Sequence, residues 1–315
     1  MDFRNRNGSR AGKKPFRFAK SLLLLVLFIC LMGLWVTGDG HAVEISISRS
    51  NGSALSVYAE AALLYDIAEG RVLYEKNAAE RCEPASLTKL LTVLTAYANG
   101  GERVRYTVGD EIGLIGGNSS IAYLRKGNVL SFEAIVDGVL LCSGNDATYT
   151  LAVNVARAAR GKSLSDTEAL AYFVELMNET ANSLGCADSH FTTVDGYPSP
   201  DHYSTAYDLL AIAVEAMNTP VISASVSKSR AYHVFDSGRE VVWETTNLLL
   251  KKDSPYYYGY ATGMKTGSTG EGFSLAASAE KDGVRRIAIV LNATSDGGRF
   301  QDAVKLFEAA WERER

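Results

Sequence analysis

The sequence predicts an α+β protein in which helices flank an antiparallel sheet and an all-helical lobe is inserted between the strands. Segments with the pattern of strands occur at about residues 55–80 and again at about 228–315. Between them, about residues 86–225 contain mainly helical segments. Strands from both ends of a chain can share one sheet when the intervening segment folds as a separate lobe. We expect a ligand-binding cleft where lobe and sheet meet.

The elements follow in this order. A hairpin is expected first, from Ala61–Asp66 and Arg71–Glu75 around Ala68-Glu69-Gly70. The expected helices of the lobe are Ser86–Ala98, Phe132–Leu141, Asp146–Ala159, Thr167–Leu184 and Ala206–Met217. Thr205 has the spacing of a capping box for the last of these helices. The remaining elements are a hairpin around Asp236-Ser237-Gly238, strands near 260–266, 272–280 and 284–292, and an amphipathic helix over Phe300–Trp311.

Residues 1–42 are predicted to be an export signal. Seven basic residues precede Leu22–Val36, fifteen residues without a charge, which is the order of regions in a signal peptide. The positive charges keep the N-terminus in the cytoplasm and direct the rest of the chain outward. Gly40-His41-Ala42 is a poor cleavage site, so a cleaved signal peptide and a retained signal anchor both stay open. We expect residues 43–315 on the outer face of the bacterial cytoplasmic membrane or in the cell-wall space.

Charge and motif content exclude several functions. Residues 1–42 hold seven of the 32 basic and two of the 36 acidic residues, so residues 43–315 carry a net charge of −9. Such an acidic body does not favour nucleic-acid binding. The sequence contains no H-E-x-x-H or C-x-x-C motif and no G-x-S-x-G elbow. We therefore expect no metal, no cofactor and no Ser-His-Asp triad, and we expect a monomer that contacts the membrane only through an uncleaved N-terminal segment.

The cysteines give a weaker indication. Cys30 lies in the apolar N-terminal segment, and Cys82, Cys142 and Cys186 lie in the predicted exported body. Three cysteines cannot all pair. We expect them to be buried thiols, and a Cys82–Cys142 disulfide is the alternative that stays open.

Three Ser-x-x-Lys matches occur, and only Ser86 to Lys89 makes chemical sense. It follows Pro84 and opens an apolar run that ends before Gly100-Gly101, as expected at the start of a helix. At positions i and i+3 a hydroxyl and an amine share one helix face. Free N–H groups at a helix start can also bind a developing oxyanion. The other two matches lie in a polar stretch (Ser225 to Lys228) and at a strand end (Ser278 to Lys281).

Two further strings complete the pattern. Ser143-Gly144-Asn145 is the only Ser-x-Asn string and falls between two expected helices, and Lys265-Thr266-Gly267 is unique and ends an expected strand. Alone, the first is an ordinary turn and the second an ordinary strand end. In this order with Ser86 to Lys89, the three strings are typical of penicillin-binding proteins and class A β-lactamases. They predict an acyl-transfer site that works without histidine.

From about Ala61 to Trp311 the chain resembles the D-alanyl-D-alanine carboxypeptidase family, the low-molecular-weight penicillin-binding proteins of serine peptidase family S11. Beyond the three motifs, the resemblance is carried by Leu64-Tyr65-Asp66, Gly70-Arg71-Val72-Leu73-Tyr74, Met177-Asn178, Leu184-Gly185, His202-Tyr203-Ser204-Thr205-Ala206 and Ala277-Ser278-Ala279-Glu280. Gly144, where class A β-lactamases carry aspartate, favours the peptidase branch. The resemblance implies a DD-peptidase/β-lactamase-like catalytic domain over residues 43–315.

The resemblance also implies a reaction, the removal of the terminal D-alanine from peptidoglycan stem pentapeptides, with β-lactam antibiotics as covalent inhibitors. Ser86 is the candidate nucleophile, and Lys89 the acylation base, which requires a pKa lowered by burial and by Lys265. Ser143 would relay the proton to the leaving D-alanine amine. Asn145 would hold the substrate amide.

The remaining candidate residues concern the substrate's carboxylate and carbonyl. Lys265 and Thr266, with Gly267, would bind the terminal carboxylate or tune the field of the site. By resemblance, the oxyanion hole is formed by the backbone N–H groups of Ser86 and Ser268. Arg299 stands where the family often has an arginine that faces the substrate carboxylate.

Two departures from the family pattern matter. Thr193-Val194-Asp195-Gly196 replaces an Asn-Pro-His-Gly-like stretch, so we assign it no role. The sequence ends at Arg315, so we expect no C-terminal β-rich domain. The sequence leaves open any endopeptidase activity on cross-links, the diamino acid of the stem peptide, and a vegetative or sporulation role.

Two other functions are weighed against the peptidase. A serine β-lactamase needs a carboxylate that drives deacylation, and we identify none, because Glu175 lies within an expected helix. A non-catalytic penicilloyl or peptidoglycan sensor, anchored by Leu22–Val36, would become acylated and stay so.

Overall fold

The computed structural model describes residues 55–313, which belong to one compact unit. The predicted export signal over residues 1–42, including its possible cleavage site, lies outside the described residues. Within the described range no single helix is long and apolar enough to cross a membrane. The pair formed by α6 (Ala206–Asn218) and α7 (Pro220–Val226), bent by 101°, is long and apolar enough by length and composition alone.

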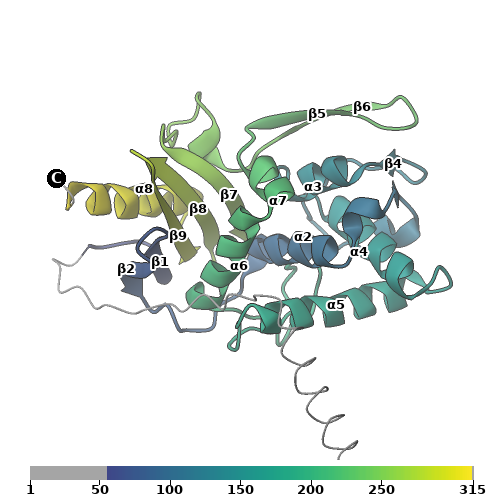
Figure 1. The fold of residues 1–315 in the computed structure, drawn as a ribbon, viewed down its shortest axis with the longest axis horizontal. Coiled ribbons are helices and arrows are strands. Elements are labelled where there is room, and N and C mark those ends of the chain that lie inside the picture. Colours follow the sequence, from purple (N-terminus) through teal and green to yellow (C-terminus); the bar gives the residue numbers. More distant parts are fainter. Residues whose placement is uncertain (1–54, 314–315) are drawn as a thin grey trace, which may run out of the picture. The chain divides into compact units, whose positions relative to one another are not determined.

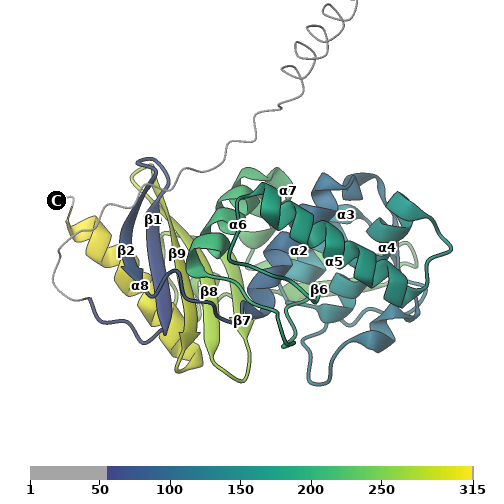
Figure 2. The same cartoon turned by 90° about the horizontal axis from the view of Figure 1, so that it is seen from below.

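The central sheet has five antiparallel strands in the order β2-β1-β9-β8-β7. Its strands are β1 (Ala61–Asp66), β2 (Arg71–Lys76), β7 (Ala261–Ser268), β8 (Phe273–Lys281) and β9 (Val284–Ala293). The strand β1 pairs with β9, for example Leu63 with Ile289, so the first hairpin and the last strands share one sheet. Figures 1 and 2 show this sheet beside the helical lobe. The predicted α+β class is confirmed.

The lobe is inserted between β2 and the last strands. It consists of α2 (Thr88–Ala98), α3 (Phe132–Leu140), α4 (Asn145–Arg160), α5 (Asp166–Ser183), α6 (Ala206–Asn218) and α7 (Pro220–Val226). Helix α2 is the centre of the lobe, because α3, α4, α5, α6 and α7 all contact it. Every residue from Thr88 to Ala96 is buried. A helix that is buried on all sides needs small or apolar side chains around its whole circumference, which its leucines, threonines and alanines supply.

The two faces of the sheet bury two different cores. On β1, Leu63 and Tyr65 join the core shared with the lobe, whereas Ala62 and Leu64 join the core under α8 (Asp296–Glu312). This alternation follows from the two-residue period of a strand. Figure 2 shows α8 on one side of the sheet and α6 on the other. The sheet therefore packs with one face against the C-terminal helix and with the other against the lobe.

Helix α8 begins four residues before the expected start at Phe300. The Ser295 hydroxyl caps it by accepting a hydrogen bond from the Gly298 N–H at 3.1 Å. A pair of weak helix formers, Gly297 and Gly298, concealed this start in the sequence. Gly297 is required by packing, since a Cβ there would lie 2.0 Å from the Tyr256 hydroxyl oxygen.

Several short elements were not expected from the sequence. The hairpin of β5 (Arg230–Val234) and β6 (Glu240–Glu244) agrees with expectation. Elements of two to seven residues are too short to show a periodic pattern of apolar residues. The only sequence signal for helix α7 is a proline at its start. These unexpected elements are α7, β3 (Tyr106–Thr107), β4 (Val129–Leu130), η2 (Gly101–Arg103), η3 (Asp110–Leu114) and η4 (Leu248–Leu250).

The capping box predicted at Thr205 is half formed. Thr205 Oγ1 accepts a hydrogen bond from the Asp208 N–H, but the Asp208 carboxylate accepts from the Asp188 N–H and the Ser189 hydroxyl instead. The Asp208 side chain therefore holds the segment before α6 rather than the helix's own first turn.

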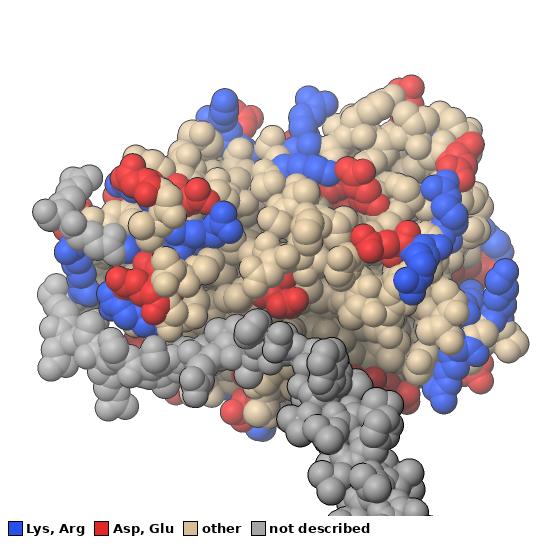
Figure 3. Space-filling view, viewed as in Figure 1, with Lys and Arg blue, Asp and Glu red and all other residues tan. Residues whose placement is uncertain are grey.

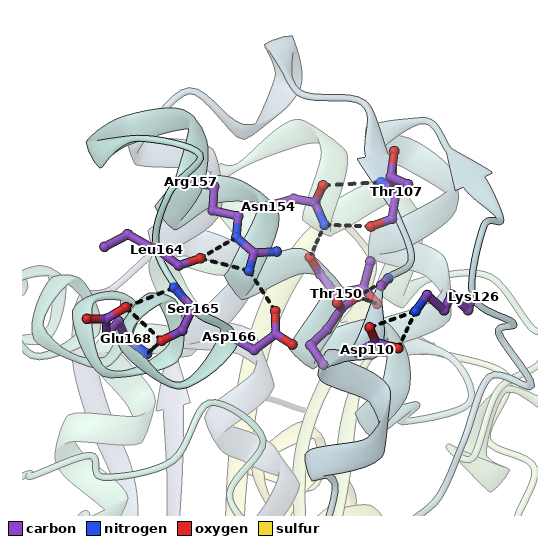
Figure 4. A network of polar contacts seen from close by, with 12 residues as sticks. Thr107, Asp110, Lys126, Thr150, Asn154, Arg157, Leu164, Ser165, Asp166 and Glu168 are labelled. Atoms are coloured by element: carbon purple, nitrogen blue, oxygen red, sulfur yellow. Dashed lines mark hydrogen bonds and ion pairs between the residues drawn. The ribbon is translucent and has the colours of Figure 1, made fainter.

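Polar contacts hold the end of the lobe that includes the α4–α5 connection (Figure 4). A complete capping box that we did not predict, formed by Ser165 and Glu168, starts α5. Arg157 near the end of α4 donates to the Leu164 carbonyl and to Asp166, at 2.8 Å and 2.7 Å from Nη2. The connection between these two helices is thus fixed by hydrogen bonds at both ends.

Charged side chains of both signs are distributed over the face of the molecule shown in Figure 3, with uncharged surface between them. Several form exposed ion pairs, such as Lys251 with Glu244 at 2.7 Å. Exposed pairs of this kind contribute about 0–1 kcal/mol each, so the stability of the fold depends mainly on its two cores.

Candidate active site

Ser86 lies in a short 3-10 turn, η1 (Ala85–Leu87), directly before α2. The expectation that the α-helix starts at Ser86 is wrong by two residues, because the Leu87 N–H bonds to the Pro84 carbonyl and the α-helix begins at Thr88. Ala85 has a left-handed φ of 50°. The turn still leaves Ser86 next to Lys89, and the Ser86 side chain is partly exposed.

Lys89 is completely buried in the first turn of α2. Its ammonium donates to Ser86 Oγ at 2.8 Å and to the backbone carbonyl of Asp195 at 2.8 Å. Burial lowers the pKa of Lys89 to about 8, and the nearby charge of Asp195 partly opposes this effect. An amine with this pKa is neutral in roughly a tenth of molecules at pH 7. It can then take the proton of the Ser86 hydroxyl.

Of the three Ser-x-x-Lys matches, only this one has a hydrogen bond between the serine hydroxyl and the lysine amine. Ser225 and Lys228 both bind the buried Asp137 carboxylate instead, at 2.6 Å and 2.8 Å. Ser278 shares a hydrogen bond with a threonine of β7. The structure therefore brings a serine hydroxyl and a lysine amine together only at the position that the sequence singled out.

Lys265 is a second buried lysine, placed on β7 with 1% of its surface exposed. Its ammonium donates to the Thr266 carbonyl at 2.8 Å. Burial lowers the pKa of Lys265 well below its ordinary value, and the positive charges of Lys89 and Arg299 lower it further. We expected burial and Lys265 to lower the pKa of Lys89. Burial is the cause that lowers it, and the positive charge of Lys89 in turn lowers the pKa of Lys265. The Thr266 hydroxyl is hydrogen-bonded to that of Thr246 at 2.6 Å.

Gly267 brings β7 against the turn that carries Ser86. A Cβ on Gly267 would lie 2.9 Å from the Ala85 side chain and 3.1 Å from the Ser86 backbone nitrogen. Only glycine permits so close an approach of the strand. The approach sets Gly267, the penultimate residue of β7, beside the turn that carries Ser86.

Arg299 of α8 is almost entirely buried against the end of β7. It donates to the Gly267 carbonyl at 2.7 Å and to the Ser268 hydroxyl at 3.1 Å, and it is paired with Asp296. Its contacts fix the end of the strand, and its positive charge lies near Lys265.

Ser143 and Asn145 approach from the lobe. Ser143 has a left-handed φ of 58° and is nearly buried, and its hydroxyl bonds to no other described residue. Asn145 is the first residue of α4, and its side-chain amide donates to the Ser119 hydroxyl at 2.8 Å. Gly144 between them packs against Ala122, where a Cβ would lie 2.7 Å from the Ala122 side chain.

The segment that contacts Asn145 is fixed by the neighbouring carboxylate. Asp146 accepts hydrogen bonds from the backbone N–H groups of Ala122 and Leu124, at 2.7 Å and 2.8 Å. Nothing in the sequence linked this segment to the site, because the contact joins residues more than twenty positions apart.

The three cysteines of the described chain are free, so the disulfide alternative for Cys82 and Cys142 is wrong. Cys82 and Cys186 are buried, as expected, and Cys142 is partly exposed. The Cys142 thiol donates to the Gly138 carbonyl at 3.1 Å, and burial raises its pKa to about 12. Cys142 is therefore a neutral thiol beside Ser143.

The segment that departs from the family pattern contributes directly to the site. Besides the Asp195 carbonyl bound to Lys89, the Val194 carbonyl accepts from the Thr92 hydroxyl of α2 at 2.6 Å. Gly196 has a φ of 79°, and a Cβ there would lie 1.9 Å from the Ala85 carbonyl oxygen. The segment thus packs on the turn of the nucleophile. We assigned it no role from the sequence, and its Asp-Gly pair was the only signal of the close approach.

His202 anchors the same segment and is the only buried histidine among the described residues. It bonds to the Thr88 hydroxyl at 3.1 Å and accepts from the Thr192 N–H at 3.0 Å. Burial lowers the pKa of His202 to about 4, so it is neutral at physiological pH. In the described part of the chain, no three histidine, cysteine or acidic side chains are grouped as metal ligands would be.

The sheet, the inserted lobe and the contact between Ser86 and Lys89 together form the arrangement that the sequence predicted for a serine peptidase with a lysine in place of histidine. Residues 48–295 match the family model for D-alanyl-D-alanine carboxypeptidase, peptidase family S11. The chain therefore belongs to the D-alanyl-D-alanine carboxypeptidase family.

Curated relatives agree with this family. The chain is 33% identical over 263 residues to D-alanyl-D-alanine carboxypeptidase DacC of Escherichia coli K12, covering 80% of this chain and 61% of that one. It is 30% identical over 297 residues to DacF of Bacillus subtilis 168, covering 92% and 70%. The chain thus spans less than two thirds of the length of the Escherichia coli relative.

Solved structures show the same fold. The crystal structure of the Streptomyces K15 DD-transpeptidase superimposes with a TM-score of 0.75 at 28% identity, covering 83% of this chain and all of that one. Penicillin-binding protein 6B of Escherichia coli gives a TM-score of 0.69 at 30% identity, covering 84% and 80%.

The pKa of Lys89 predicts the pH dependence of acylation by benzylpenicillin. Protonated Lys89 cannot accept the Ser86 proton, so the rate constant of labelling should rise about tenfold per pH unit below pH 8 and level off above it. Lys89→Arg should abolish labelling, because a guanidinium stays protonated. The matched variant Lys228→Arg, in the second Ser-x-x-Lys match, should label normally. Rates that do not change between pH 6 and pH 9 would contradict this role.

Proposed function

We propose that this protein is a serine-type D-Ala-D-Ala carboxypeptidase that removes the terminal D-alanine from peptidoglycan stem pentapeptides. The observation that carries the proposal is the contact of 2.8 Å between Lys89 Nζ and Ser86 Oγ, at a buried lysine whose pKa is lowered to about 8. Membership of a family described as D-alanyl-D-alanine carboxypeptidase supports the substrate class.

Acylation starts when neutral Lys89 takes the proton of the Ser86 hydroxyl. The oxygen attacks the carbonyl carbon of the penultimate D-alanine, and the backbone N–H groups of Ser86 and Ser268 bind the resulting oxyanion. Ser143 relays the proton to the nitrogen of the terminal D-alanine as the peptide bond breaks. This role suits a nearly buried hydroxyl without a protein partner among the described residues.

Substrate binding uses residues of the lobe and of the sheet. Asn145 of α4 holds the backbone amide of the stem peptide from the side of the lobe. Lys265, Thr266 and Gly267 of β7 bind the terminal carboxylate from the side of the sheet, and Arg299 adds positive charge at the end of the strand. A free carboxylate is then required for good binding, which explains the cleavage of a terminal residue.

Deacylation needs water after D-alanine has left. The departure of the amino acid opens space beside the ester, and Lys89 or Ser143 activates the incoming water. An opened β-lactam stays attached and blocks this approach. Glu175, the glutamate considered for a β-lactamase, is exposed on α5 and lies 3.9 Å from Arg160, so it offers no support for rapid lactam hydrolysis.

The purified protein should release D-alanine from diacetyl-Lys-D-Ala-D-Ala with multiple turnovers and should retain benzylpenicillin for minutes or longer. Ser86→Ala should abolish both reactions with a melting temperature within a few degrees of the wild type. Ser225→Ala, in the second Ser-x-x-Lys match, should keep both. Peptide mapping should place the penicilloyl group on Ser86.

The two rival functions are the other outcomes of this experiment. Rapid multiple turnover of penicillin would identify a serine β-lactamase. Stable labelling without D-alanine release from any stem peptide would identify a penicilloyl or peptidoglycan sensor.

We further propose that the enzyme acts outside the cytoplasmic membrane, because its stem-peptide substrate lies there and residues 1–42 have the charge pattern of an export signal. Protease added to intact, wall-stripped cells should digest it, whereas a cytoplasmic control protein should survive. Complete protection would contradict export.

A further inference from the structure

The carboxylate of Asp195 is a buried charge that the proposed reaction does not yet use. Its residue is 1% exposed. One carboxylate oxygen, Oδ1, accepts a hydrogen bond from the Tyr197 N–H at 3.0 Å, whereas Oδ2 has no hydrogen-bond partner. A buried carboxylate with a free oxygen is costly unless a positive charge nearby compensates it.

Lys89 is the positive charge that acts on this carboxylate, although the two groups form no direct ion pair. The Asp195 backbone carbonyl accepts a hydrogen bond from Lys89 Nζ at 2.8 Å, which places the residue next to the amine. The interaction between the two charges raises the pKa of Lys89 against the larger, lowering effect of burial. We assigned Asp195 no role from the sequence, and the structure places this residue beside Lys89.

The other groups that face this pair come from three elements. The ammonium form of Lys265 on β7 repels that of Lys89, and Cys142, next to Ser143, is a protonated thiol. Tyr149 of α4 lies near Asp195, whose charge contributes to the raised pKa of the phenol. Among these described neighbours of Lys89, Asp195 is the one carboxylate whose charge acts on its amine.

We propose that Asp195 is a positioning residue for the peptidase reaction, whose carboxylate supplies the counter-charge for the ammonium form of Lys89 when that lysine has taken the proton of Ser86. The inference rests on the proposed function. The step it concerns is a proton transfer from Ser86 Oγ to Lys89 Nζ, and the transfer converts a neutral amine into a cation beside a fixed anion. The backbone carbonyl of Asp195 orients the amine, and the side chain stabilises the charge.

This role predicts opposite effects of removing the carboxylate on the rate of benzylpenicillin labelling at low pH and at high pH. Without the carboxylate, Lys89 becomes a weaker base that is neutral at lower pH. The acidic limb of benzylpenicillin labelling should therefore move down by about one pH unit, while the alkaline plateau falls because a weaker base removes the serine proton more slowly. The profiles of wild type and variant should cross.

The test is the rate of penicillin labelling of Asp195→Asn from pH 5.5 to pH 9.5. Asparagine keeps the shape, the backbone carbonyl and an oxygen for the Tyr197 N–H. We expect labelling about threefold faster than wild type at pH 6 and about threefold slower at pH 9. Asp195→Glu, which restores a carboxylate, should move the limb back toward that of wild type.

The matched control is Asp208→Asn, which removes a buried carboxylate that bonds to the Asp188 N–H and the Ser189 hydroxyl. Its profile should overlay that of wild type. If Asp195→Asn does not fold, Asp195→Ser removes the same charge with a smaller side chain and should shift the limb in the same direction.

A folded Asp195→Asn or Asp195→Ser variant whose limb stays at the wild-type pH would overturn the proposal. So would a rate that falls by the same factor at every pH, which is the result of a purely structural role. Failure of the proposed function is recognised separately, because the wild-type protein would then release no D-alanine or would carry no penicilloyl group on Ser86.

Discussion

The proposed function of this protein depends on one hydrogen bond, from the buried amine of Lys89 to the hydroxyl of Ser86. Serine is a poor nucleophile until a base takes its proton, and an ordinary lysine is no base at neutral pH. Burial solves this problem by penalising the charged form of the amine. The fold must therefore exclude water from the lysine amine and leave the neighbouring serine accessible to substrate.

The architecture meets both conditions. Helix α2 is surrounded by the other helices of the lobe, so its first turn, with Lys89, lies in the protein interior. The sheet contributes β7, which can approach the Ser86 turn closely because Gly267 has no side chain. The segment around Gly196 closes the other side under the same restriction. Two glycines, one from the sheet and one from a loop, thus let three backbone segments meet around one turn.

Much of this arrangement could be predicted from the sequence, since it depends on local patterns. The order of Ser86 to Lys89, Ser143 to Asn145 and Lys265 to Gly267 predicted the candidate site, and the segments with strand pattern at both ends predicted the class of fold. Contacts between distant segments could not be predicted. The bonds from Lys89 to Asp195 and from Asn145 to Ser119 join positions with no shared pattern, and the 3-10 turn at Ser86 depends on tertiary packing.

The most direct test of the central claim is the titration of Lys89 itself. Protein labelled with ¹³C at the lysine Cε gives one resonance for each lysine, and the signal of Lys89 is the one that disappears in Lys89→Arg. The account predicts a titration midpoint near pH 8 for this signal. A midpoint near the ordinary value of 10.5 would show that the amine stays charged at neutral pH, and it would contradict the role of Lys89 as the base.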